Sequence, residues 1–292
     1  MTTLQDDDNY NKRELKPVPL LSGIEEIRQD FEERLEGGDT VYGIEILDDY
    51  VKTIRPGSLT FILARPNSGK SLLSQHLASN LAKQDKRVLL CSCEMGSGLL
   101  MERQLKILAG IDVNDLMQMY RCERDGANRV LDMPLDNFEY AYLNNIDVVE
   151  TGGATVIDLM KMLDIYNEYD MVIVDYIQRV KGKGTEYENI SNACRELQTY
   201  ARRTGKPLIV CSQAKRPASG STPNLADAGS AGKGSGSIEE DGDVAILLSE
   251  LFEGSTKYIL MTLFKNRYGN KNITYKYKLN HRLQFLLEQK DI

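Results

Sequence analysis

The 292-residue sequence contains no tryptophan, only two histidines and only five cysteines. His76 and His281 lie far apart, and no pair of cysteines has the CxxC spacing of a zinc site. No stretch approaches the ~18 apolar residues that a membrane-spanning helix needs. The polar, acidic N-terminus is neither a signal peptide nor a transit peptide. These absences argue against a thiol- or histidine-rich metal centre and against a membrane partner, and we expect a protein of the cytoplasm.

An excess of positive charge is also absent. The chain carries 43 acidic and 36 basic side chains, so its net charge of −7 argues against a broad basic surface for nucleic acid. A narrow basic channel remains compatible with this balance. The composition is 41% hydrophobic and 27% charged, with no internal repeat and no second core. The sequence therefore predicts one large α/β domain with an N-terminal appendage.

The appendage has two predicted parts. Residues 1–19 are polar without an apolar period and predict a disordered tail. Residues 20–38 predict an amphipathic helix that packs on this domain or on a neighbouring subunit. Its apolar stripe consists of Ile24, Ile27, Phe31 and Leu35.

Strand and helix patterns alternate through the main domain, residues 39–292. This alternation predicts a parallel sheet with crossover helices. The expected parallel strands are 59–63, 87–93, 147–150, 171–174 and 207–211; the expected helices are 69–83, 97–109, 155–166 and 188–204, with a further helical region at 113–143. Residues 214–237 are rich in Gly, Ser, Ala and Pro and predict a long mobile loop. Four final strands, at 243–248, 257–264, 273–279 and 283–286, extend one edge of the sheet, the last of them antiparallel.

The segment from Ser58 to Leu73 carries the clearest chemistry. An apolar strand runs into a tight loop and a helix, which nearly matches the phosphate-binding pattern G-x-x-x-x-G-K-[ST] with Ala64 at the first glycine position. Backbone N–H groups would bind the phosphates, Lys70 would reach the β- and γ-phosphates, and Ser71 would ligate Mg²⁺. The alternative is a strand–turn–helix with an accidental G-K-S. The predicted nucleotide-binding residues are Ala64, Arg65, Pro66, Asn67, Ser68, Gly69, Lys70, Ser71 and Leu72.

Three further polar residues follow buried strands. Glu94 could orient the water that attacks the γ-phosphate, and Asp175 follows four apolar residues as in a Walker B strand aimed at Mg²⁺. Gln213 could sense the γ-phosphate, since an amide both donates and accepts. Each could instead be a solvated strand end.

Lys265 and Arg267, two residues apart on a strand, should share a face. They could complete the nucleotide site of a neighbouring subunit as an arginine finger with a lysine companion. Spacing alone favours a basic edge strand that discourages aggregation.

Taken together, these motifs resemble one family. ARPNSGKS, CSCEM, VIVDYIQ, CSQAKR, GSIEEDGDVAILL and FKNRYG occur in the order and spacing of the RecA-like motor domain of DnaB-type replicative helicases, from about Gly43 to Leu286. The family's own loop begins with alanine. The resemblance implies a RecA-like P-loop NTPase fold for residues 39–292 and a linker helix at 20–38 that docks on the next motor domain. It also implies hexameric rings, ATP with Mg²⁺ hydrolysed between subunits, and translocation on single-stranded DNA.

The resemblance also assigns roles. It makes Lys70 and Ser71 the phosphate and Mg²⁺ ligands, Glu94 the catalytic carboxylate and Asp175 the Walker B residue. Gln213 would couple nucleotide state to the DNA loops, and Lys265 with Arg267 would act in trans. The predicted DNA-binding residues lie in two glycine-rich loops and are Arg179, Lys181, Lys183, Lys215, Arg216 and Lys233.

Two departures and two alternatives accompany this hypothesis. The family's globular N-terminal domain has no counterpart here, and the loop after Gln213 is long, which favours a compact phage or plasmid type. Primase binding is therefore in doubt, while a primase, a loader or another replisome protein stays a candidate partner. One alternative is a RecA-like recombination or regulatory ATPase that binds DNA without unwinding. The other is a degenerate replisome adaptor that binds through the stripe in residues 20–38.

Overall fold

The computed structural model describes residues 28, 39–65, 68–109, 112–123, 125–126, 142–175, 177, 184–214, 240–280 and 285–289. The chain divides into two compact units, Met1–Asp39 and Thr40–Ile292, and the following description concerns the second. Within 1–38 the structure describes Arg28 alone, so the tail and the linker helix stay predictions.

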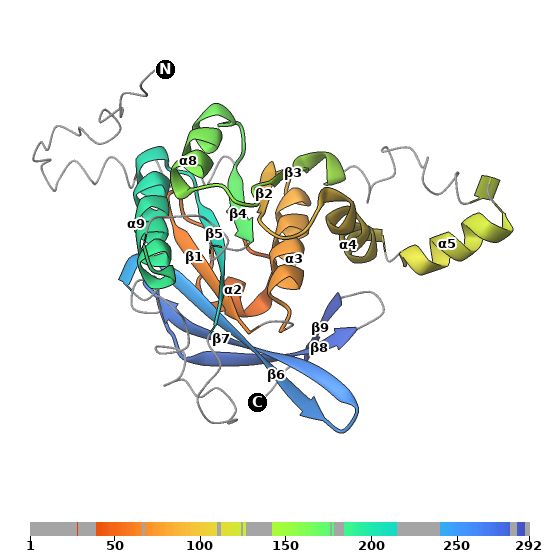
Figure 1. Ribbon diagram of the computed structural model, residues 1–292. Helices are drawn as coiled ribbons and strands as arrows, with labels where there is room; N and C mark the ends of the chain where they lie inside the picture. Colours follow the sequence, from red (N-terminus) through yellow and green to blue (C-terminus); the bar gives the residue numbers. More distant parts are fainter. Residues whose placement is uncertain are drawn as a thin grey trace, which may run out of the picture. The chain divides into compact units, whose positions relative to one another are not determined.

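A single sheet runs through the described part of the second unit (Figure 1). Its nine strands lie in the order β3 (Ile146–Glu150), β2 (Val88–Ser92), β4 (Met171–Asp175), β5 (Leu208–Gln213), β1 (Leu59–Ala64), β6 (Val244–Glu253), β7 (Thr256–Asn266), β8 (Ile273–Asn280) and β9 (Phe285–Gln289). The first six are parallel neighbours, and the pairs β6–β7, β7–β8 and β8–β9 are antiparallel. The predicted parallel sheet with an antiparallel extension is confirmed, and the extension begins at β7.

Helices cover both faces of the parallel strands (Figure 1). The helices with described bounds are α2 (Glu45–Tyr50), α3 (Lys70–Ala82), α4 (Ser97–Ala109), α5 (Val113–Cys122), η3 (Tyr142–Asn145), α8 (Val156–Ile165) and α9 (Glu186–Thr204). Of these, α5 contacts α4 and projects away from the sheet (Figure 1). Alternate residues of β1 face opposite sides: Phe61 packs in a core cluster with α8 and α9, and Ile62 packs in a second cluster with α2 and α3. Because both faces are covered, β1 is buried along its whole length, and Thr60 is its one polar residue.

The structure describes only part of the helical region predicted at 113–143. The side chain of Asp112 accepts a hydrogen bond from Asn114 N at 2.8 Å and caps α5, which ends at Cys122. The 3₁₀ helix η3 follows at residues 142–145, and residues 127–141 lie outside the described residues.

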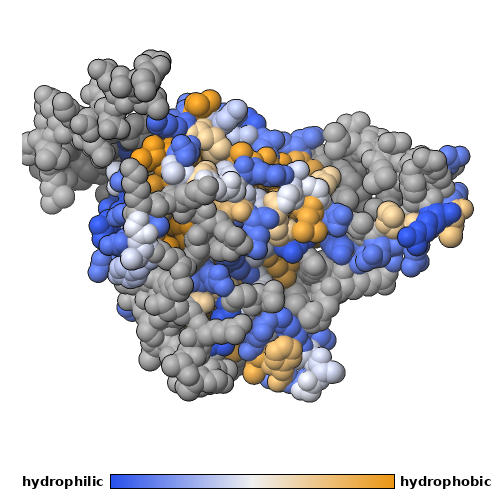
Figure 2. All heavy atoms as spheres, viewed as in Figure 1, coloured by the Kyte–Doolittle hydropathy of each residue, from blue (hydrophilic) through white to orange (hydrophobic). Residues whose placement is uncertain are grey.

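Apolar side chains reach the surface around α8 (Figure 2). Leu159, Met160 and Leu163 point into the core, whereas Ile157 and Ile165 are 53% and 73% exposed. Among the described residues, no helix combines the length and the apolar character needed to cross a bilayer.

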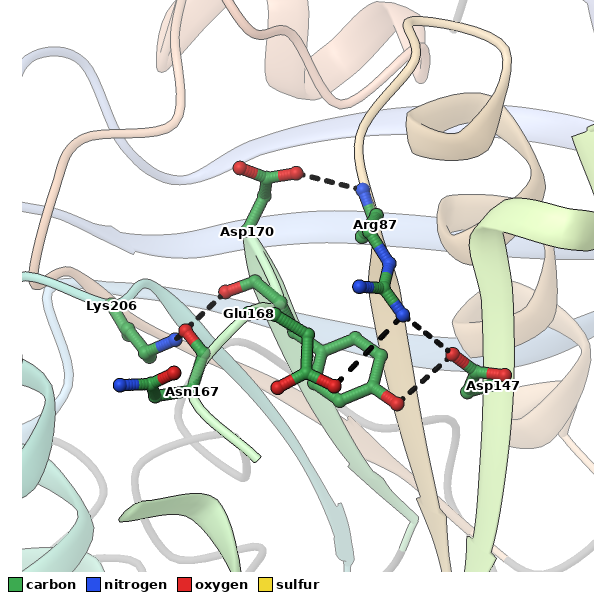
Figure 3. A network of polar contacts seen from close by, with 7 residues as sticks. Arg87, Asp147, Asn167, Glu168, Asp170 and Lys206 are labelled. Carbon is green, nitrogen blue, oxygen red and sulfur yellow. Dashed lines mark hydrogen bonds and ion pairs between the residues drawn. The ribbon is translucent and has the colours of Figure 1, made fainter. Parts of the chain in front are cut away.

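A polar network closes the amino ends of β2, β3 and β4 (Figure 3). Arg87 N donates to Asp170 Oδ2 at 2.7 Å, and Arg87 Nη2 pairs with Asp147 Oδ2 at 3.2 Å. The hydroxyl of Tyr169 donates to the same Asp147 oxygen at 2.9 Å, and Lys206 Nζ donates to Tyr169 O at 3.0 Å. Burial raises the pKa of Tyr169 to about 12. This edge of the sheet is therefore held by contacts within the chain.

Candidate nucleotide-binding site

Four predicted site residues, Ala64, Glu94, Asp175 and Gln213, lie at the carboxyl edge of the neighbouring strands β2, β4, β5 and β1. Ala64, the last residue of β1, pairs with Gln213, the last residue of β5. Ser92, the last residue of β2, pairs with Asp175, the last residue of β4. In open α/β sheets, ligands bind outside this edge. The parallel register thus brings together residues that are up to 150 positions apart in sequence.

The phosphate-loop pattern tolerates its alanine because Ala64 still belongs to β1. Ala64 pairs with Gln213 on one side and Leu248 on the other, and it is not among the residues with positive φ. Gly69 adopts φ +89° at the N-cap of α3, a conformation that favours glycine. Pro66 and Asn67 lie outside the described residues.

The N-terminus of α3 differs from those of the other long helices. Helices α8 and α9 begin with capping boxes, Thr155 with Asp158 and Thr185 with Glu188. In the described chain, no side chain caps α3, and its first ladder bond runs from Leu73 N to Gly69 O at 2.8 Å. The preceding N–H groups of Lys70, Ser71 and Leu72 therefore lie where a helix binds an anion.

Lys70 and Asp175 form an ion pair across this edge. Lys70 Nζ lies 3.3 Å from Asp175 Oδ1, and their side chains are 13% and 9% exposed. The geometry is not that of a hydrogen bond, so Asp175 Oδ1 is a buried oxygen without a hydrogen-bond donor among the described residues. Arg65 Nη2 in the loop is likewise buried without an acceptor there. Both atoms carry a desolvation cost that a bound ligand would relieve.

The donor set suits Mg²⁺ bound to a nucleotide. The described residues contain no cluster of three His, Cys, Asp or Glu side chains that could cage a metal. Mg²⁺ is usually held by one or two protein oxygens, waters and substrate phosphates. Asp175 Oδ1 supplies a buried carboxylate oxygen, and Ser71 supplies a hydroxyl on the first turn of α3. These two residues therefore fit the group.

Glu94 and Gln213 lie at the same edge. Glu94 is exposed two residues beyond β2, and Gln213 is half-buried at the end of β5. The sequence analysis did not predict one nearby cation, Arg103 in α4. Burial lowers the pKa of Arg103, while the charge of Asp175 opposes this shift. The rule that selects polar strand ends cannot find a residue inside a helix.

Lys265 and Arg267 lie at the opposite edge. Asn266 pairs with Val244, and Val244 pairs with Thr60 near the start of β1. The edge-strand alternative is wrong, because β7 lies between β6 and β8 inside the sheet. The two cations do share a face: Arg267 Nη2 and Lys265 Nζ reach Glu240 O at 2.9 and 3.5 Å. Lys265 lies near the end of β7, and Arg267 lies in the turn that follows it.

A comparison with protein families decides the classification. The family described as DnaB-like helicase C terminal domain matches residues 40–285. The chain belongs to this family. Among relatives of this DnaB-like domain, replicative DNA helicase DnaB of Treponema pallidum is 30% identical over 219 residues, which cover 70% of this chain and 47% of the relative. A probable plasmid replicative DNA helicase of Chlamydia trachomatis is 28% identical over 269 residues, covering 87% and 56%.

The chain spans about half the length of these curated relatives. A solved ATPase domain matches the DnaB-like domain with a TM-score of 0.74 at 21% identity, covering 91% of this chain and 98% of that one. At this identity the match shows the shared RecA-like fold alone.

The predicted DNA-binding residues of the DnaB-like domain remain untested by this geometry. All six lie outside the described residues: Arg179, Lys181, Lys183, Lys215, Arg216 and Lys233.

Proposed function

We propose that this domain is an ATP-driven helicase motor that forms a ring, hydrolyses ATP between subunits and translocates on single-stranded DNA. One observation supports the proposal: the predicted phosphate-binding residues and the predicted finger residues, Lys265 and Arg267, lie at opposite edges of one sheet. The phosphate-binding half is at the carboxyl edge, and the finger half is at the amino edge.

The phosphate-binding half would bind ATP and Mg²⁺. The N–H groups at the start of α3 and the ammonium of Lys70 would hold the phosphates. Ser71 and Asp175 would hold Mg²⁺, which neutralises charge on the β- and γ-phosphates when bound. Lys70 would then exchange its pairing with Asp175 for the phosphates. Such an exchange keeps both side chains paired before and after binding.

Two other strand-end residues would have separate roles. Glu94 would act on the attacking water, and Gln213 would pass the nucleotide state to the predicted DNA loop. Glu94 is exposed and can accept a proton from water or orient it. Gln213 continues through Ala214 into the predicted DNA loop, so a contact with the γ-phosphate would reach that loop directly. The main chain at this joint is anchored, since Ala214 N donates to Ala64 O at 2.8 Å.

The finger half, Lys265 and Arg267, would complete the nucleotide site of another subunit. Strand β1 has six residues, so the two edges are separated by about 17 Å at ~3.3 Å per residue. Arg267 lies beside the start of β1 and cannot reach the loop after its end. A head-to-tail assembly places the finger of one copy at the phosphate loop of the next, and such heterologous contacts close into rings. We expect a hexamer, with the helix at 20–38 docking on the neighbouring subunit.

DNA would pass through the centre of the ring. The six predicted cations, in an otherwise acidic chain, suffice to hold a phosphate backbone without reading bases. A primase or a loader is a further candidate partner, which the family membership suggests and the described residues do not address.

Mixed assemblies test the shared site. Lys70→Ala subunits lack the phosphate-binding half, and Arg267→Ala subunits lack the finger half, so each variant alone should be inert while Arg267→Ala still binds ATP. When the two are mixed in equal amounts with single-stranded DNA, about a quarter of the head-to-tail interfaces combine two intact halves, and ATPase activity should return. A mixture of Lys70→Ala with the Lys70→Ala/Arg267→Ala double variant is the control and should stay inert.

The outcome separates this function from its rivals. Full activity of Arg267→Ala alone, or no recovery in mixtures whose subunits exchange, would contradict the shared site. ATPase activity without strand displacement would favour a RecA-like ATPase that does not unwind DNA. Wild-type protein without ATPase activity in the presence of single-stranded DNA would favour the adaptor.

A further inference from the structure

Asp243 joins the finger half to the centre of the sheet. It precedes β6, and its side chain is 8% exposed. Asp243 Oδ2 accepts a hydrogen bond from Leu59 N at 2.9 Å, and Asp243 N donates to Leu59 O at 2.8 Å. These two bonds fix both the backbone and the carboxylate of Asp243 against the start of β1.

The other carboxylate oxygen faces the predicted finger. Asp243 Oδ1 lies 3.2 Å from Arg267 Nη1, and Arg202 Nη2 of α9 is farther away at 3.9 Å. Arg267 N donates to Asp243 O at 2.9 Å, and Arg267 Nη2 donates to Glu240 O at 2.9 Å. The segment 240–243 thus contacts Arg267 at its backbone and at both ends of its guanidinium.

The turn that carries Arg267 is fixed from the other side. Asn266 Nδ2 donates to Tyr50 O at 2.9 Å and to Asn270 O at 3.0 Å, and Asn266 Oδ1 accepts from Tyr268 N at 3.0 Å. The backbone around Arg267 is therefore held without the Asp243 carboxylate. What Asp243 adds is the placement of the long arginine side chain, which is 42% exposed.

We propose that Asp243 is a positioning residue, which holds the Arg267 guanidinium in the orientation that completes the neighbouring subunit's nucleotide site. This inference rests on the proposed function of Arg267. The contacts named above are an ion pair at Nη1 and one hydrogen bond from Nη2, and a guanidinium has five N–H donors. The remaining donors can meet a γ-phosphate, and an anchored guanidinium loses less side-chain entropy when it does so. Because a finger acts in the transition state, its misplacement should lower kcat and leave the KM for ATP nearly unchanged.

The test variant is Asp243→Asn, whose amide oxygen can still accept from Leu59 N while the charge facing Arg267 is lost. We expect kcat of the assembled protein to fall about ten- to a hundredfold, as for a small misplacement of a catalytic group, with KM within about twofold. Asp243→Ser, which removes the charge with a shorter polar side chain, should also lower kcat and serves if the asparagine variant fails to fold. Arg202→Gln removes the other arginine near this carboxylate and should leave kcat unchanged.

Subunit mixing assigns the defect to one half of the site. A finger defect predicts that Asp243→Asn recovers activity with Lys70→Ala, which supplies an intact finger, and does not recover with Arg267→Ala. The reverse pattern would mean that Asp243 acts through β1 on its own phosphate loop, and it would overturn the inference. An unchanged kcat in Asp243→Asn would overturn it too. The mixture of Lys70→Ala with Arg267→Ala, run in parallel, tests the proposed function separately.

Discussion

The two edges of the parallel strands carry the same kinds of polar residue but differ in how far those residues are hydrogen-bonded within the chain. At the amino edge, Arg87, Asp147 and Tyr169 satisfy one another within the chain. At the carboxyl edge, Asp175 Oδ1 and Arg65 Nη2 are buried without hydrogen-bond partners among the described residues. Buried polar groups in folded proteins are normally hydrogen-bonded, so unsatisfied ones mark strain or a binding site. The polar groups at the amino ends of β2, β3 and β4 are thus satisfied within the chain, whereas the carboxyl edge holds buried polar groups that a ligand could satisfy.

A further contrast lies among helices that begin at the carboxyl edge. Helices α8 and α9 carry reciprocal capping boxes, whereas the start of α3 has no side-chain cap in the described chain. The N-terminal N–H groups of α3, at the positive end of the helix dipole, are thus available to bind an anion. Substitutions at the two edges should therefore affect different measurements.

The largest effect is expected at Lys70. Lys70→Met removes the cation but keeps an apolar stem of similar length, and ATP hydrolysis should fall on the order of 10³-fold. Stability should fall as well, because Asp175 is left as a buried charge without its partner. Adding Asp175→Asn should restore the melting temperature and not the hydrolysis. If the double variant melts no higher than Lys70→Met, the ion pair is not the cause.

Glycines with positive φ at the two edges offer a matched pair. Gly69→Ala forces a Cβ into φ +89°, although within 4 Å that Cβ would meet only Ile259, at 3.8 Å. Gly205→Ala forces one into φ +72° with nothing within 4 Å in the described chain. Each should lower the free energy of unfolding by about 1 kcal/mol through backbone strain. Only Gly69→Ala should also weaken ATP binding, as measured by titration with a fluorescent analogue; equal binding by both variants would contradict the contrast.

A third substitution probes the amino edge alone. Arg87→Gln removes the pair with Asp147 and the cation over the Tyr169 ring, whose centroid lies 5.0 Å from the guanidinium carbon. Because Arg87 and Asp147 are 43% and 49% exposed, we expect a loss of about 1 kcal/mol and a melting temperature lower by about 2–4 °C. The kcat for ATP should not change. A reduced kcat would show that the two edges are coupled.

The smallest expected effect concerns pH and Asp48, which lies at neither set of strand ends. Burial raises the pKa of Asp48 from 3.8 to about 6, although the N–H groups of Tyr42, Gly43 and Ile44 oppose the shift. Between these values the folded state holds a proton that the unfolded state has lost, so this residue's contribution to stability declines as pH rises from about 4 to 6. Asp48→Asn cannot ionise and should gain stability relative to wild type over that window. Urea unfolding midpoints from pH 4 to pH 7 measure the difference, and parallel curves would refute it.

Much of this fold could be predicted because its signals are local. Buried strands such as Met171–Asp175 are uninterrupted apolar runs, and each predicted strand from 59 to 211 is present within a few residues. The strand-end rule also located Asp175 and Gln213, since parallel strands share one carboxyl edge. The region predicted as helical at 113–143 contains α5 and η3, and its residues 127–141 lie outside the described residues.

The remaining features depend on contacts between distant segments. Nothing in the local pattern around Asp243 shows that its carboxylate meets Leu59 and Arg267, which the sheet order alone brings together. The same holds for Arg103, whose nearness to Asp175 depends on how α4 packs. The interior position of β7 likewise follows from the later strand β8, which pairs with it. Such facts require a topology before they can be argued.

Strand β1 has a mechanical consequence for any assembly of this chain. Its first residue is bonded to Asp243 and its last leads into the phosphate loop, with every residue between them buried and paired on both sides. It therefore acts as a rod of fixed length between the two interfaces that one subunit would form. If the ring forms, the conformational change that drives translocation cannot come from stretching or bending β1. The motion has to arise at the joints, as each subunit swings as a rigid lever against the next.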